Sequence, residues 1–236
     1  MKTIRTIILA AALLLAAPAV KAQTFDTEIG ADIVSRYVWR GMSLGDVSIQ
    51  PTLGISAWGL SLSAWGSVGL SNPSDNKELD ITLAYSIGGF NVGITDYWLT
   101  DGPDVENRYF HYAAGTTNHV YEANVGYDFG PVAIQWYTNF AGNDAHREDG
   151  KPVFSSYAEV SVPFSIGGVD CTAAAGIVPF ATTYYGASRF AITNLSVTAT
   201  KDIKLTDSFS LPLFATLAAN PHTRQAFFVV GITLKP

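Results

Sequence analysis

The stretch that decides the fold is FDTEIGADIVSRYVWR, residues 25–40. Its side chains alternate in character, because one parity is largely apolar and the other carries five charges. The apolar parity holds Phe25, Thr27, Ile29, Ala31, Ile33, Ser35, Tyr37 and Trp39. The five charged residues of the other parity are Asp26, Glu28, Asp32, Arg36 and Arg40. A period of two over these 16 residues predicts one long strand with an apolar and a polar face.

The same alternation returns along the rest of the chain. Clear segments occupy residues 46–57, 60–70, 78–87, 90–95, 121–128, 132–140 and 157–164. Blander segments occupy residues 169–179, 190–200, 208–218 and 225–235. Together with the first stretch they predict about twelve strands, most near the 9–11 residues that a tilted strand needs to cross a bilayer.

The connections between these segments alternate between short and long. Tight links are expected at Trp58-Gly59, Gly88-Gly89, Phe129-Gly130-Pro131, Gly167-Gly168 and residues 201–207. Longer, more polar links are expected at residues 71–77, 100–117, 141–152, 180–189 and 219–224, with one short link at 41–45 on the same side. Short periplasmic turns and longer extracellular loops are typical of outer-membrane barrels. The prediction is therefore an all-β, closed antiparallel transmembrane β-barrel.

Composition favours the same fold over a soluble β-sandwich, which would also alternate. Only 14% of the residues are charged, against about 25% in an ordinary soluble domain. Aromatic side chains also collect near the expected strand ends, as in interfacial belts. At the long-loop rim these aromatics are Tyr37, Trp39, Tyr97, Trp98, Phe140 and Phe154.

The N-terminus has the pattern of a secretory signal peptide. Lys2 and Arg5 precede an apolar run over residues 7–17, which is too short to span a bilayer. Small residues before Gln23 provide a cleavage site. We expect residues 1–22 to be removed and residues 23–236 to form the barrel in the outer membrane of a Gram-negative bacterium.

Charge and cysteine content exclude several other classes of protein. Losing Lys2, Arg5 and Lys21 takes the formal net charge from −6 to −9, which disfavours nucleic-acid binding. Cys171 is the single cysteine, so an intrachain disulfide is impossible. No His/Cys cluster has the spacing of a zinc site, and we expect neither a metal nor a cofactor.

Two motifs resemble those of a known family. Residues 34–43 (VSRYVWRGMS), followed by Gln50-Pro51, resemble the start of the TorF-type family of outer-membrane porins. Asp80 and Tyr85 before a glycine turn resemble a later strand of that family, and the match covers residues 32–98. The resemblance implies a barrel of porin type and no catalytic residue. The chain ends in Leu234-Lys235-Pro236, without the terminal aromatic residue common in barrel proteins.

The charged parity of the strands is expected to face the lumen. The residues proposed to line a pore are Asp32, Arg36, Arg40, Glu78, Asp80, Glu122 and Glu159. Because rings of carboxylates attract cations, they predict a cation-preferring channel for passive diffusion of small hydrophilic solutes or ions. The alternative is a polar plug, in which Arg36 and Arg40 pair with carboxylates across the lumen. A barrel of this width is compatible with both.

Two other function classes remain open at this point. An outer-membrane hydrolase needs a nucleophile activated by a positioned histidine, and His111, His119, His146 and His222 have no suitably spaced partners. The chain is therefore not expected to be an enzyme. A plugged barrel that binds a surface partner through its loops is the other alternative, and loop 100–117 could fold inward or cover the outside. Lipid is the expected surrounding partner, while the solute and the oligomeric state are open.

Overall fold

The computed structural model describes residues 25–72, 75–207 and 209–236, and these residues form fourteen strands. The expected signal peptide, residues 1–22, lies outside the described residues. No helix long and apolar enough to cross a membrane occurs among the described residues. The strands are β1 (Asp26–Val34), β2 (Tyr37–Trp39), β3 (Met42–Gly45), β4 (Ser48–Ala57), β5 (Leu60–Gly69), β6 (Glu78–Ile87), β7 (Phe90–Leu99), β8 (His119–Asp128), β9 (Ala133–Gly142), β10 (Ser156–Ile166), β11 (Val169–Val178), β12 (Ala191–Lys204), β13 (Ser210–Asn220) and β14 (Gln225–Leu234).

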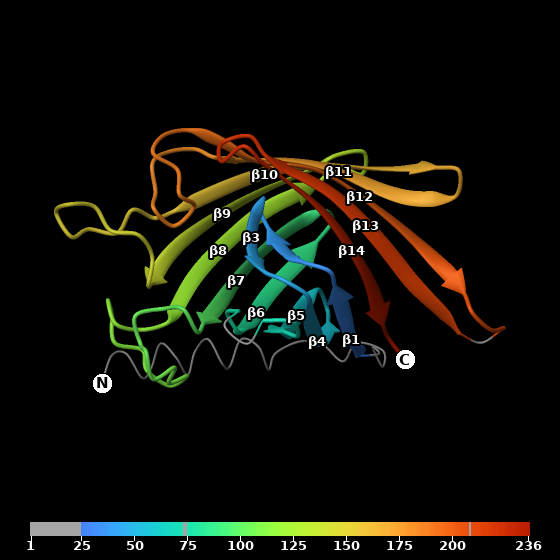
Figure 1. The fold of residues 1–236 in the computed structure, drawn as a ribbon, viewed down its shortest axis with the longest axis horizontal. Coiled ribbons are helices and arrows are strands. Elements are labelled where there is room, and N and C mark those ends of the chain that lie inside the picture. Colours follow the sequence, from blue (N-terminus) through green and yellow to red (C-terminus); the bar gives the residue numbers. More distant parts are fainter. Residues whose placement is uncertain (1–24, 73–74, 208) are drawn as a thin grey trace, which may run out of the picture.

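Twelve of these strands close into one antiparallel barrel, which confirms the predicted fold class. Each strand pairs with its neighbour in sequence, from β4 round to β14, and β1 completes the ring between β14 and β4. The remaining two strands, β2 and β3, lie between β1 and β4 in the sequence. They form a separate hairpin, which is blue in Figure 1.

The two ends of the barrel differ in the length of their connections. At one end, which we call the turn end, β4–β5, β6–β7 and β10–β11 are joined by pairs of residues at 58–59, 88–89 and 167–168. These pairs have positive φ throughout, as the tight primed hairpin turns require. At the other end, the loop end, β7–β8 and β9–β10 are joined by residues 100–118 and 143–155 (Figure 1).

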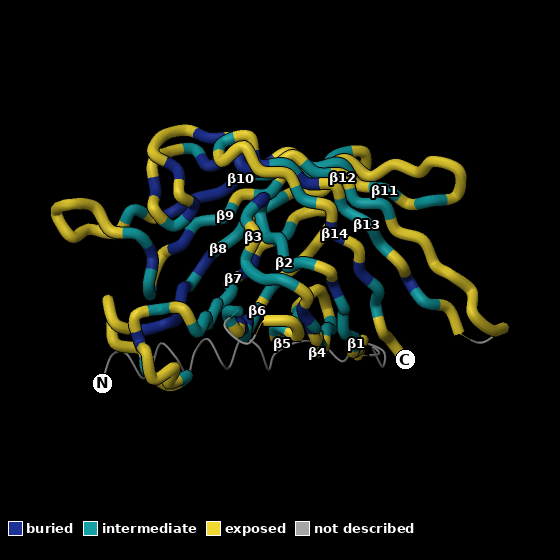
Figure 2. Tube along the Cα trace, viewed as in Figure 1, coloured by how far each residue is buried: buried dark blue, intermediate teal, exposed yellow. Residues whose placement is uncertain are grey.

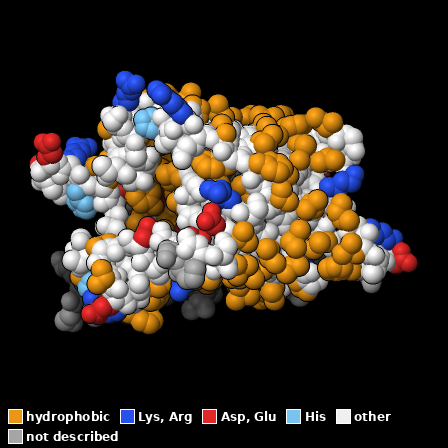
Figure 3. Space-filling model, viewed as in Figure 1, with side chains coloured by type: hydrophobic (Ala, Val, Ile, Leu, Met, Phe, Trp, Pro, Cys, Tyr) orange, Lys and Arg blue, Asp and Glu red, His pale blue; other side chains and the backbone are white. Residues whose placement is uncertain are grey.

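The outer surface of the barrel is apolar, as a surface that faces lipid requires. Outward side chains remain exposed, for example Leu53, Leu62, Leu83 and Ile94. Figure 3 shows hydrophobic side chains gathered over the strands, while most charged side chains lie toward the two ends and a few near the middle of this face. Inward positions alternate with these, so the period of two separates a lipid face from a lumen face.

Burial is concentrated at the loop end of the barrel. Buried residues occupy the loop-end halves of the strands, whereas the turn-end halves are mostly exposed or intermediate (Figure 2). A buried cluster of Tyr157, Val178, Tyr185, Ala187 and Ala191 lies there. The lumen is therefore packed at one end, where the separate hairpin lies, and lined by small side chains at the other.

The prediction of one long strand over residues 25–40 was wrong. Strand β1 ends at Val34, and residues 35–47 form a hairpin, which we call the inner hairpin, built from β2 and β3. Its tip is Arg40-Gly41, with φ angles of 50° and 78°. The alternation continued across the break because β2 is itself a strand. The expected link at 41–45 is therefore the tip and second strand of the hairpin.

The ring closes at a short seam between β1 and β14. These strands pair over residues 31–34 and 231–234, the shortest ladder among the described barrel strands. Ser35 extends the seam by one step, because its backbone N–H donates to the Val230 carbonyl at 2.8 Å. The Val230 N–H in turn donates to Ser35 Oγ at 2.9 Å. The base of the inner hairpin is thus fastened to β14.

Candidate functional site

The inner hairpin is anchored through its tip to the wall formed by β12 and β13. Asn220 Nδ2, at the end of β13, donates a hydrogen bond to the Gly41 carbonyl at 3.1 Å. A Cβ at Gly41 would overlap the backbone carbonyl of Thr193 in β12, so only glycine fits. The positive φ of Gly41 imposes the same requirement. The tip therefore lies against β12 and β13, across the lumen from β6 to β8.

Arg40 forms a buried ion pair with Glu122 on β8. Its Nη1 and Nη2 atoms donate to Oε2 and Oε1 of Glu122 at 2.6 and 2.8 Å, a bidentate geometry. The Arg40 and Glu122 side chains are 7% and 2% exposed. Tyr97 on β7 donates its hydroxyl to Glu122 Oε1 at 2.9 Å, and Arg40 also donates to the Tyr185 hydroxyl. Both charges are therefore compensated inside the barrel.

Four aromatic rings surround the Arg40 guanidinium. Its Cζ atom lies 4.2 Å from the Trp39 ring centroid and 4.1 Å from that of Tyr137. The rings of Tyr157 and Tyr185 lie 4.7 and 5.9 Å away. These distances are within the range of cation–π attraction. Tyr37, Trp39 and Tyr97 therefore belong to the lumen, and the prediction that they form part of a lipid-facing belt was wrong.

The other expected lumen residues occupy separate places. Asp32 on β1 accepts a hydrogen bond from Thr233 Oγ1 at 2.6 Å. Arg36 lies on the inner hairpin and not on a wall strand, and it pairs with Asp46 at 3.3 Å. Glu159 on β10 accepts a hydrogen bond from Asn194 at 3.3 Å. The structure thus brings Arg40 and Glu122 together, and the role of the full set as pore lining stays a prediction.

Glu78 and Asp80 form a second acidic group on the inner face of β6. Both are buried, and the Tyr37 hydroxyl hydrogen-bonds to Glu78. The two carboxyl groups lie two residues apart on the same face of β6. Asp80 Oδ1 is buried without a hydrogen-bond partner. In the described residues, neither carboxylate has a Lys or Arg within ion-pair distance.

Two cavities flank the inner hairpin. One, of about 260 Å³, lies beside its tip and is lined by Trp39, Met42, Glu78, Tyr97, Asp101 and Tyr184 together with smaller apolar and amide residues. The other, of about 320 Å³, is lined by Asp32, Arg36, Gln50 and Asn194 with neighbouring residues of the hairpin and of β12 to β14. The hairpin therefore divides the loop end of the lumen without filling it.

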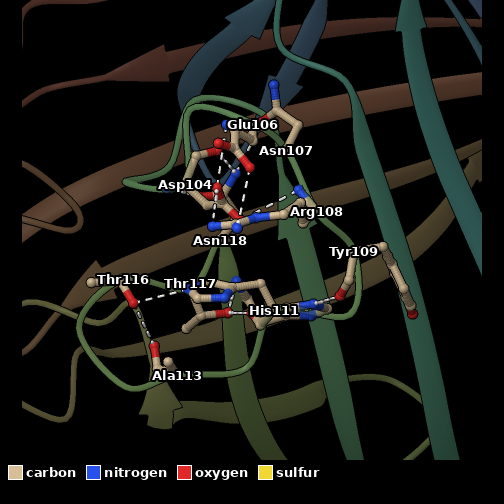
Figure 4. A network of polar contacts seen from close by, with 11 residues as sticks. Asp104, Glu106, Asn107, Arg108, Tyr109, His111, Ala113, Thr116, Thr117 and Asn118 are labelled. Carbon is tan, nitrogen blue, oxygen red and sulfur yellow. Dashed lines mark hydrogen bonds and ion pairs between the residues drawn. The ribbon is translucent and has the colours of Figure 1, made fainter.

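The long loop between β7 and β8 is internally ordered (Figure 4). Asp104 accepts hydrogen bonds from Arg108 Nε and Nη2 at 3.1 and 3.2 Å, and the Arg108 guanidinium lowers the pKa of the Asp104 carboxyl. Asn118 Oδ1 accepts from the Asp104 backbone N–H at 2.7 Å, while Asn118 Nδ2 donates to the Asp104 carbonyl at 3.0 Å. Thr117 donates to the His111 carbonyl at 2.7 Å.

This loop covers the outside of the barrel. His119 and Asp96 lie on the lipid-facing parity of β8 and β7, and their Nδ1 and Oδ1 atoms are 2.7 Å apart. The other ring nitrogen of His119 is 2.5 Å from the Tyr109 carbonyl in the loop. Both ring nitrogens of His119 are therefore engaged, one by Asp96 on the barrel and the other by Tyr109 in the loop. The side chains of Tyr109 and Tyr112 pack on the His119 ring, which is completely buried.

Sequence reasoning missed this contact, because a histidine on a lipid-facing parity does not by itself indicate that a loop packs over it. The pairing of two polar residues, Asp96 and His119, on an otherwise apolar parity was the available signal. The inner hairpin had a signal as well, because the first alternating stretch is longer than one bilayer crossing needs.

The comparisons with known proteins give one family. A family model described as "Bacterial protein of unknown function (Gcw_chp)" matches residues 16–225. The TorF-type name expected from the sequence is not confirmed by this match and stays a prediction. The search of curated proteins gives no match.

The chain is also similar to a solved porin structure, "Structure of porin refined at 1.8 angstroms resolution". The sequence identity is 14% and the TM-score is 0.36, with 81% of this chain and 63% of that chain covered. The chain therefore spans less than two thirds of that porin.

Proposed function

The chain belongs to the Gcw_chp family of bacterial proteins of unknown function, and from its structure we propose that it is a channel-like protein of the bacterial outer membrane. Small hydrophilic solutes or ions diffuse through its lumen, and lipid surrounds its apolar outer face. The observation that carries the proposal is a closed barrel whose inner hairpin narrows the loop end and leaves cavities on both sides.

The turn-end half of the lumen supports this proposal. Its inward side chains are short and polar, as a water-filled passage requires. They include Ser61, Ser63, Thr82, Thr95 and Asn124. Thr82 and Thr95 hydrogen-bond to each other across two strands at 3.0 Å, so they remain on the wall. The hairpin is then the narrowest part of the route, at the extracellular end of the barrel.

The acidic side chains of the lumen support a preference for cations. Asp26 and Glu28 line a small cavity on the inner face of the turn end. Glu78 and Asp101 line the cavity beside the hairpin tip. The positive charge of Arg40 in the lumen is neutralised by Glu122. Rings and pairs of carboxylates along a passage attract cations.

The test is single-channel recording of the protein purified from membranes, in a planar lipid bilayer under a salt gradient. We expect discrete conductance steps with a reversal potential on the cation side. Glu28→Lys should shift this potential toward anions without touching the hairpin. Glu148→Lys, in an exposed loop outside the lumen, is the matched control and should leave the potential unchanged. An inserted barrel that never conducts would contradict the channel.

One observation favours a second candidate, a plugged barrel that binds a partner at the cell surface. Arg40 is held by Glu122 and by aromatic rings from several strands, which is the arrangement of a fixed plug. Absence of conductance, with loop deletions that abolish binding to cells, would favour this role. An enzymatic role is not proposed, since the ring nitrogens of His119 are both engaged and His111 hydrogen-bonds to Thr116.

A further inference from the structure

The cavity beside the hairpin tip combines negative charge with aromatic rings. Glu78 enters it from β6, and Asp101 enters it from the start of the long loop. Trp39 from the hairpin, Tyr97 from β7 and Tyr184 from the loop before β12 complete its polar-aromatic lining. Its volume of about 260 Å³ is slightly below the range typical of drug-sized ligands, so it suits a small molecule.

The negative charge around this cavity has no cationic partner in the described protein. Asp101 Oδ2 accepts a hydrogen bond from Asn76 at 2.6 Å, which is neutral. Glu78 and Asp80 are both buried on β6, and Asp80 Oδ1 has no hydrogen-bond partner. Arg40, the nearest cation of the hairpin, is already bound on both nitrogens by Glu122. Glu78 is buried and Asp101 is exposed, and neither carboxylate pairs with a Lys or Arg within the described residues, so the site lacks a positive group.

Arg40 itself shows which chemistry this part of the lumen accepts. Its planar cation lies against the rings of Trp39, Tyr137 and Tyr157 and binds one carboxylate. The cavity presents the same two components, aromatic rings and carboxylates, and it shares Trp39 with the Arg40 site. A hydrophilic neutral solute would satisfy neither the charge nor the rings.

We propose that this cavity is a binding site for small organic cations, with an ammonium or guanidinium group between Glu78 and Asp101 and an apolar part against Trp39, Tyr97 and Met42. The proposal deepens the proposed function by naming the solute class, and it rests on that function for access of solutes to this end of the lumen. Inorganic cations lack the apolar part and bind more weakly.

Isothermal titration calorimetry on the intact detergent-solubilised protein tests the site directly. The probe is benzylammonium chloride, and benzyl alcohol of nearly the same shape is the neutral comparison. We expect saturable binding of benzylammonium and no measurable binding of benzyl alcohol. Asp101→Asn should weaken benzylammonium binding by about tenfold, since it removes one cavity charge at an exposed position. Asp149→Asn, an exposed loop carboxylate that pairs with Lys151, should have no effect.

Three results would overturn the proposal: no saturable binding, equal affinity for both probes, or equal affinities of the two variants. Glu78→Gln tests the carboxylate that β6 contributes to the cavity, independently of Asp101. Heat-modifiable gel migration checks that this variant still forms the barrel. Conductance is measured separately. A protein that binds benzylammonium but never conducts keeps this site and loses the channel, while one that conducts without binding loses this site alone.

Discussion

Removing the Glu122 carboxylate should release the inner hairpin. Glu122→Gln leaves the Arg40 guanidinium buried without a charged partner, although the geometry of the side chain is kept. Breaking a buried ion pair in this way costs about 3–5 kcal/mol. Each 1.4 kcal/mol is about a factor of ten in an equilibrium constant. If this cost falls on docking of the hairpin, the displaced state becomes about 10²- to 4 × 10³-fold more populated.

Thiol labelling measures this population. Met42→Cys places a reactive group on the inner hairpin, where it packs against the buried cluster, in a Cys171→Ala background that removes the single natural thiol. The rate of modification by a membrane-impermeant maleimide should rise with the population of the displaced hairpin. Larger conductance steps should accompany it.

The control and the double variant make the test specific to the ion pair. Glu148→Gln changes an exposed loop residue and should leave the labelling rate unchanged. Arg40→Gln with Glu122→Gln should be less than additive, because the two single variants lose the same interaction. An unchanged rate in Glu122→Gln, or strict additivity of the pair, would refute the idea that this ion pair holds the hairpin.

Three further perturbations test the wall, the loop and the tip. Val125→Arg on the lipid face should oppose membrane insertion by about 2–4 kcal/mol and reduce the amount of folded barrel on gels. Asn124→Arg on the lumen face should have neither effect, and equal tolerance of the two substitutions would contradict the assignment of faces. His119→Ala should release the β7–β8 loop from the barrel, with a loss of about 1.5–3 kcal/mol in the local stability of the loop. Proteolysis of the loop should then be faster, and an unchanged cleavage rate would show that His119 does not hold the loop. Gly41→Ala should expose the hairpin to labelling, because a Cβ at this position overlaps β12. Gly150→Ala is the control: its φ of 79° is similar but the space around it is open, so it should cost about 1–2 kcal/mol of backbone strain and leave the hairpin docked. Similar labelling of both variants would show that contact with β12 is unimportant.

The strands and short turns could be predicted from the sequence because each is a local pattern. Alternation with a period of two sets the lumen and lipid faces, and Gly88-Gly89 or Gly167-Gly168 supply the positive φ that a two-residue turn needs. Pairing of each strand with its neighbour along the chain then follows from the short links. The closed ring of twelve strands needed no further information.

The site could not be predicted in the same way, because its contacts join distant parts of the chain. Arg40 and Glu122 are separated by 82 residues, and both have the same parity as ordinary lumen residues. The break after Val34 keeps the alternation, so it was hidden in a pattern that fits a single strand. The packing of the β7–β8 loop over His119 depends on the path of that loop. Neither the alternation of side chains nor the composition of the sequence determines this path.

The short seam between β1 and β14 bears on the order of assembly. Its few paired residues make it the ladder most easily opened, and it joins the two ends of the chain, so it closes last if the barrel zips up from β4 to β14. Ser35 is at once the last step of that seam and the base of the inner hairpin. Completing the ring therefore sets the hairpin's point of entry into the lumen, and opening the seam would release the base of the hairpin from β14.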